Sequence, residues 1–130
     1  IQYRDEKGID QRIDAIKFFH LTHAKYITTS FPTYRFIATL GDVDVADVMY
    51  SHRFPEATDE NLRLVHVQGE NAFVGMGVVA ARVMKCGQAI CHYTGQYVAQ
   101  NQRGAEYQLG DINAAHYRGL GAMVNHSFPN

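Results

Sequence analysis

The amino-acid sequence predicts a mainly β fold with some α structure, built from short strands and small sheets, with a partly helical flank at residues 1–61. Short apolar segments separated by glycine turns in residues 62–130 predict the strands. A helical spacing of apolar residues over 9–24 predicts the helix of the flank. With 130 residues, 46% hydrophobic and 19% charged, the chain has the composition of a globular domain with one core.

The flank contains one predicted amphipathic helix, at 9–24. Ile9, Ile13 and Ile16 recur at spacings of four and three, and charged residues lie between them. The rest of the flank is predicted as a breaker at 28–32, a strand at 34–40, a strand or a helix at 42–50, and a loop at 52–61.

The region 62–130 is predicted to be rich in β structure. Residues 62–67 alternate apolar and polar side chains, as expected of a strand with one buried face. The other predicted strands are 78–84, 89–93 and 107–109, and the predicted turns and loops are 69–71, 85–88 and 99–106. An apolar run at 120–124 should be buried, and polar Asn125 and His126 follow it at once. Because buried polar groups need partners, these two should meet another part of the fold or a ligand.

Charge and composition exclude several classes of protein. The formal net charge of -1 leaves no overall basic field for nucleic acid, although only Glu70, Glu106 and Asp111 of the 13 acidic residues follow Val67. No apolar run is long enough to cross a membrane. The 2 cysteines are too few for a disulfide framework and favour a reducing compartment. The sequence predicts no particular oligomeric state.

No metal site is expected. His20 and His23 lie about one helical turn apart, but a zinc site needs three or four ligands, and no cysteine cluster accompanies them. Asp42, Asp44 and Asp47 lack the glycine and the glutamate of a calcium loop.

The segment 75–80 formally fits the dinucleotide fingerprint G-x-G-x-x-G/A. That fingerprint needs a helix after the glycines and an acidic residue about 20 positions further on. Val78 and Val79 favour a strand instead, and no Asp or Glu occurs from 78 to 105. The segment is therefore interpreted as a glycine turn between strands or as part of a different cofactor site.

Five short segments occur in an order typical of one enzyme family. They are Gly75-Met76-Gly77, Lys85-Cys86-Gly87-Gln88, Tyr93-Thr94-Gly95-Gln96, Ile112-Asn113-Ala114 and Asn125-His126-Ser127. In this order and at these spacings they resemble the SET-domain protein lysine methyltransferases. The resemblance covers residues 62–130, whereas residues 1–61 match no family pattern.

The resemblance implies a SET-like β-clip fold that uses S-adenosylmethionine to methylate a lysine of a protein substrate, with histone tails as the default. The residues that it assigns to cofactor binding are Gly75, Met76, Gly77, Asn125 and His126. It also implies a nuclear enzyme or an effector delivered into another cell.

Methyl transfer to lysine needs a particular environment. The attacking amine must be neutral, whereas free lysine has a pKa of about 10.4, so the site must disfavour the ammonium. Attack is in line with the sulfur, so positioning is most of the catalysis. Aromatic rings exclude water, and tyrosine oxygens can meet the methyl hydrogens through weak C–H···O contacts. By resemblance, Tyr93 and Tyr107 are the catalytic candidates; for each, a core ring with a satisfied hydroxyl is the alternative.

The chain departs from the family pattern at several positions. Gln96 stands where Glu is usual, Asn113 where Asp is usual, and Arg118-Gly119 where Gly-Asn is usual. The family's last segment, which carries a principal catalytic tyrosine, would have to follow residue 130. Two alternatives therefore stay open: a catalytically inactive SET-like module that binds a peptide or protein partner, and a small-molecule binding domain that uses the glycine segment.

Overall fold

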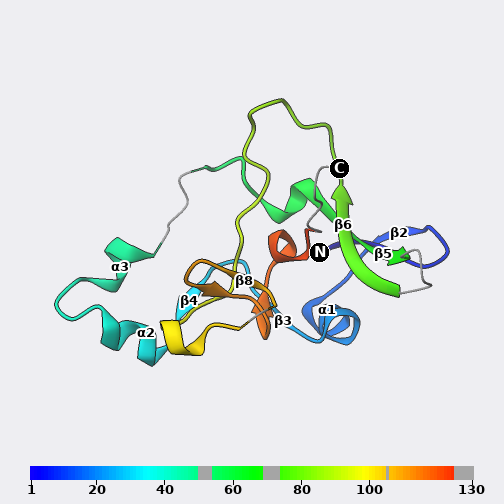
Figure 1. Cartoon of the computed structure of the whole chain (residues 1–130). Helices are drawn as coiled ribbons and strands as arrows, with labels where there is room; N and C mark the ends of the chain where they lie inside the picture. The colour runs from blue at the N-terminus through cyan, green and yellow to red at the C-terminus, as the bar shows by residue number, and fades with distance from the viewer. Residues whose placement is uncertain (50–53, 69–73, 105, 125–130) are drawn as a thin grey trace, which may run out of the picture.

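A computed structural model describes residues 1–49, 54–68, 74–104 and 106–124 of the chain (Figure 1). In these ranges short strands form three small sheets, and the helices are few and short. The coarse prediction of a mixed fold made largely of short strands in small sheets is therefore confirmed.

The sheet with the longest strands has the order β2-β1-β5-β6. Its strands are β1 Gln2–Arg4, β2 Asp10–Arg12, β5 Leu62–Gln68 and β6 Val74–Ala80. β5 and β6 pair antiparallel along their whole length, while β1 runs parallel to β5 with Tyr3 opposite Leu64. The strand predicted at 62–67 is confirmed.

Two further sheets join the flank to the rest of the chain. In one, β3 (Lys25–Tyr26) pairs with β10 (Tyr117–Arg118). The other has the order β4-β7-β9-β8, with β4 Phe31–Pro32, β7 Gln96–Tyr97, β9 Ile112–Asn113 and β8 Gln108–Leu109. All three sheets therefore combine strands from residues 1–61 with strands from residues 62–130.

The core forms where α1 (Ala15–Thr22) and η3 (Leu120–Met123) pack against β1 and β5. Phe18, Leu64 and Leu120 are fully buried there, and Tyr3, Leu62 and Met123 complete the cluster. The prediction that the apolar run 120–124 is buried is confirmed for Leu120–Met123, whereas Val124 is exposed.

The helix predicted at 9–24 is present but shorter. Residues 10–12 pair with β1 as β2, so the helix begins only after Asp14. The Asp14 carboxylate accepts the backbone N–H of Lys17 at 2.9 Å and caps the first turn. The helix ends at His23, whose backbone is left-handed with φ 60°.

The strand predicted at 34–40 is wrong, because this segment forms helix α2 (Tyr34–Thr39). Thr33 caps the helix by accepting the backbone N–H of Phe36 at 3.2 Å. Phe36 is its buried side chain and packs against the ring of Tyr97, so a single anchor replaces the alternating face that a strand would need. The remaining helical segments are α3 Val45–Val48, η1 Asp59–Asn61 and η2 Gln100–Gln102. Of the two alternatives predicted for 42–50, α3 confirms the helix, and η1 lies within the loop predicted at 52–61.

The glycine segment 75–77 lies inside strand β6 and not in a turn, so that interpretation is wrong. The predicted strand 78–84 instead ends at Ala80, because pairing with all of β5 carries the strand back through the glycines to Val74.

The strand predicted at 89–93 is also wrong. No described strand pairs with it, and the Ile90 carbonyl accepts instead from the backbone N–H of Thr58 at 3.0 Å and the side chain of Asn61 at 2.7 Å. The turn at 85–88 is confirmed by a 3.0 Å hydrogen bond from the N–H of Gln88 to the Lys85 carbonyl, and the strand at 107–109 survives as β8. The turn predicted at 69–71 lies outside the described residues.

Candidate functional site

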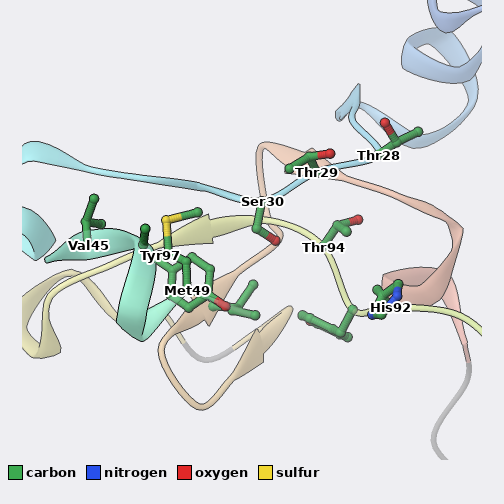
Figure 2. A pocket seen from close by; sticks show the side chains of 11 residues that line it. Thr28, Thr29, Ser30, Val45, Met49, His92, Thr94 and Tyr97 are labelled. Carbon is green, nitrogen blue, oxygen red and sulfur yellow. The ribbon is translucent and has the colours of Figure 1, made fainter. Parts of the chain in front are cut away.

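A cleft of about 530 Å³ lies between the flank and residues 92–97. Residues 28–30 and the α3 region form one wall. Figure 2 shows Val45, Met49 and Tyr97 at one end of the cleft, and Thr94 and His92 at the other. One end is therefore apolar and the other polar, and none of the described lining residues is an Asp, Glu, Lys or Arg.

Backbone pairing between β4 and β7 holds the two walls together. The N–H of Phe31 donates to the Gly95 carbonyl at 3.3 Å, and the N–H of Gly95 donates to Ser30 Oγ at 3.1 Å. A Cβ at position 95 would lie 2.5 Å from the carbonyl oxygen of Asn113. Only glycine fits this close approach, which gives a structural reason for the glycine that follows Tyr93-Thr94.

A second cavity of about 250 Å³ adjoins the cleft and shares Thr28, His92 and Thr94 with it. Thr94 is only 7% exposed, and its Oγ1 has no hydrogen-bond partner among the described residues. An added Cβ at Gly119 would overlap this oxygen, so the glycine leaves room beside it. A buried hydroxyl without a partner is costly, and Thr94 lies between the two cavities.

Asp59 organises the floor of the second cavity. Its Oδ2 accepts the hydroxyl of Tyr26 at 2.6 Å and the backbone N–H of Leu120 at 3.0 Å. Burial, and then the hydrogen bond to Asp59, raise the pKa of Tyr26 far above its ordinary value, so this hydroxyl stays a donor. Asp59 thereby links β3 to η3, the element that leads to Asn125.

Removing the Asp59 carboxylate should destabilise the fold. We expect Asp59→Ala to lower the free energy of unfolding by about 2–3 kcal/mol, because it leaves two donors unpaired, and Tyr26→Phe to lower it by about 1–2 kcal/mol. The double variant should lose less than the sum, by about 1 kcal/mol, since both changes break the same bond. Urea denaturation measures all three. Tyr34→Phe is the matched control, because Tyr34 is 92% exposed, and strict additivity would contradict the shared bond.

The two predicted catalytic tyrosines differ in their surroundings. Tyr93 is half-buried and lines the cleft. Burial raises its pKa, the charge of Arg118 lowers it, and Tyr107 raises it, so all three groups lie within electrostatic reach. Tyr107 is exposed, but the guanidinium carbon of Arg118 lies 3.7 Å from the centroid of its ring.

The predicted cofactor residues lie elsewhere. Gly75, Met76 and Gly77 belong to β6, and none of them lines the cleft or the second cavity. β6 is an edge strand in the described part of the chain, and it packs against η3. Asn125 and His126 follow η3 directly but lie outside the described residues.

The sequence pointed less clearly to three further residues: Arg118, Asp59 and Thr94. In the sequence Arg118 stands out only as a departure from the family pattern. Its isolation is the signal that could have identified it, because it is the one Lys, Arg, Asp or Glu between Asp111 and the end of the chain. Asp59 and Thr94 carry no such signal, because their roles depend on η3 and on Gly119 folding against them.

Within the described ranges no group of three or more His, Cys, Asp or Glu side chains could hold a metal ion. The helices of the same ranges are all too short or too polar to cross a membrane. Comparison with known proteins gave no match, whether to family models, to curated proteins or to solved structures.

Proposed function

We propose that the chain is an S-adenosylmethionine-dependent protein lysine methyltransferase with a SET-like fold. Its substrate is a lysine on a protein tail, with histone tails as the first class to test. The observation that supports this best is the half-buried Tyr93 in the lining of the cleft, since this is one of the two tyrosines that the family resemblance assigns to the active site. A nuclear location, or delivery into another cell, belongs to the same proposal.

The cofactor, when bound, supplies a methyl group on a sulfonium. The tyrosines then have two tasks. Their rings exclude water from the acceptor amine, which disfavours the ammonium form of the lysine. Their oxygens orient the amine and contact the polarised methyl hydrogens. Because burial raises the pKa of Tyr93, its hydroxyl is neutral and offers both a donor and an acceptor.

The edge of β6 fits the methionine part of the cofactor. An edge strand presents unpaired main-chain N–H and C=O groups, and Gly75 and Gly77 have no side chains to keep a ligand away. Met76 packs against the core and anchors this edge. Asn125 and His126, which follow η3, are assigned to the cofactor's polar groups by resemblance.

Calorimetry tests the cofactor assignment directly. The full-length protein should bind S-adenosylmethionine, and Asn125→Ala should weaken binding by about tenfold or more because the cofactor loses a hydrogen-bonding side chain. Methyl transfer should fall with it, while far-UV circular dichroism is unchanged. Asn101→Ala is the control, since Asn101 is an exposed residue of η2. Absence of both binding heat and thermal shift in the full-length protein would exclude the proposal.

The second candidate is a catalytically inactive SET-like module that binds a peptide or protein partner. Gln96 and Asn113, which replace acidic residues of the family, favour it. In the structure Gln96 lies opposite Asn113 in the pairing of β7 with β9, and the Asn113 side chain donates to Gln108 at 3.0 Å, so Asn113 has a structural role in this sheet. Incubation with labelled cofactor and histone peptides separates the candidates, because peptide binding without label transfer is expected only of the inactive module.

A further inference from the structure

Arg118 is a buried cation in an unusual environment. Arg118 is only 3% exposed, and no described carboxylate forms an ion pair with it. Its Nε donates to the Ala114 carbonyl at 2.8 Å, and one terminal nitrogen donates to the Ala115 carbonyl at 2.8 Å. The other terminal nitrogen lies 3.4 Å from the sulfur of Met123. The guanidinium is thus held by neutral partners, which fix its position without cancelling its charge.

Tyr107 is held in a strained position by the same group. Its backbone is left-handed with φ 55°, a region that a bulky residue rarely occupies. The Tyr107 carbonyl accepts the N–H of Ala114 at 2.7 Å, and Ala114 in turn accepts from Arg118. The ring of Tyr107 then covers the guanidinium at 3.7 Å. Tyr107, Ala114 and Arg118 are therefore joined in a ring of mutual contacts, and Arg118 fixes the position of the Tyr107 side chain.

We propose that Arg118 is a positioning residue for Tyr107, and that its charge, which no described carboxylate pairs with, makes the site select a neutral amine as acceptor. Arg118 fixes the orientation of Tyr107 through the stacked ring and through the Ala114 carbonyl. A second cation beside a buried guanidinium is disfavoured, so a lysine ammonium loses its proton more readily there than in water. This role rests on the proposed methyltransferase function, although the contact between Arg118 and Tyr107 does not.

In the described ranges the other titratable groups nearby form no ion pair with Arg118. Asp59 accepts from the neutral hydroxyl of Tyr26 on β3 and keeps its negative charge, but it forms no ion pair with Arg118. Lys25 on β3 adds positive charge, with its Nζ 5.5 Å from the centroid of the Tyr117 ring. His116, next to β10, and Glu106, next to Tyr107, are exposed to solvent, which screens them. Among the described residues Arg118 is therefore the buried cation that contacts Tyr107 directly.

The first test needs neither cofactor nor turnover. Carbon-13 NMR of ring-labelled tyrosines, assigned with Tyr93→Phe and Tyr107→Phe, follows each phenol through an alkaline titration. In Arg118→Met the Tyr107 ring signal should move toward that of a solvent-exposed tyrosine, and the Tyr93 midpoint should rise by about half a pH unit or more as a neighbouring positive charge is lost. Arg103→Met is the control, because Arg103 is exposed and pairs with Asp111; both signals should stay in place.

The variant Arg118→Lys separates the effect of the stacked guanidinium from the effect of its charge. It tests the positioning role even if Arg118→Met does not fold. Lysine keeps the charge but lacks the planar group that stacks on the ring. The Tyr107 signal should therefore move while the Tyr93 midpoint stays near that of the unmodified protein. Unchanged Tyr107 and Tyr93 signals in Arg118→Met, or in Arg118→Lys an unchanged Tyr107 signal, would overturn the positioning role.

The second test addresses the acceptor amine. The rate constant kcat for a lysine peptide should rise with pH, and in Arg118→Met the midpoint of that rise should move up by about one pH unit because the ammonium is no longer repelled. KM for the peptide should change less than threefold. An unchanged midpoint would overturn the electrostatic part of the proposal. If the NMR changes occur but no cofactor binds, the methyltransferase function fails while the Arg118–Tyr107 contact stands.

Discussion

On the proposed function, replacing Tyr93 by phenylalanine should lower methyl transfer by about 100-fold while the affinity for S-adenosylmethionine changes less than threefold. The ring that helps to line the cleft is kept, so water exclusion is largely preserved. What is lost is the hydroxyl that orients the amine, and small errors in the placement of reacting groups cost about 100-fold in rate. A single-turnover assay with a labelled cofactor measures the rate, and calorimetry measures the affinity.

Tyr34→Phe is the matched control, since it removes a hydroxyl from a tyrosine that is 92% exposed and should leave the rate unchanged. The pH dependence adds a second check. Because burial raises the pKa of Tyr93 above its ordinary value of 10.0, the hydroxyl stays protonated up to about pH 9. The rate should therefore rise, and not fall, between pH 7 and pH 9 as the lysine amine deprotonates. Equal rates in Tyr93→Phe and the unmodified protein would remove Tyr93 from the catalytic site.

Replacing Phe18 by alanine should cost about 3–5 kcal/mol of the free energy of unfolding, a large share of the roughly 5–15 kcal/mol typical of a domain. Phe18 is 0% exposed and belongs to the same buried cluster as Leu64 and Leu120. Its ring also packs edge-on against Tyr26, with 5.1 Å between the centroids. The cavity left by the ring would therefore loosen both the core and the Tyr26–Asp59 pair beside the second cavity.

Urea denaturation of Phe18→Ala and Phe19→Ala checks this prediction with a matched pair on one helix. Phe19 follows Phe18 in α1 but is 44% exposed, so its removal should cost less than about 1 kcal/mol. Equal losses in the two variants would mean that Phe18 does not anchor the core. Asp59→Ala is expected to lie between them.

Local patterns in the sequence predicted some elements well. The alternation at 62–67 predicted β5 because a strand with one buried face needs alternate apolar residues. The apolar run before Asn125 predicted burial of Leu120–Met123. The strand predicted at 34–40 is wrong, because the Thr33 cap and one buried anchor, Phe36, make a helix there. The prediction also failed at the glycines of β6, because pairing with β5 overrides the tendency of glycine to form turns.

The sequence by itself determined which candidate functional residues the chain contains. They are a glycine segment, tyrosines at 93 and 107, a polar Asn125-His126 after an apolar run, and one isolated cation at 118. Only the tertiary structure decided that the ring of Tyr107 stacks on Arg118 and that this arginine has no described carboxylate partner. Tyr107 precedes the β8–β9 reversal at Gly110, with φ 57°, and Arg118 lies in the β3–β10 pairing. Contacts between residues distant in sequence arise from such chain reversals and strand pairings, which no local pattern encodes.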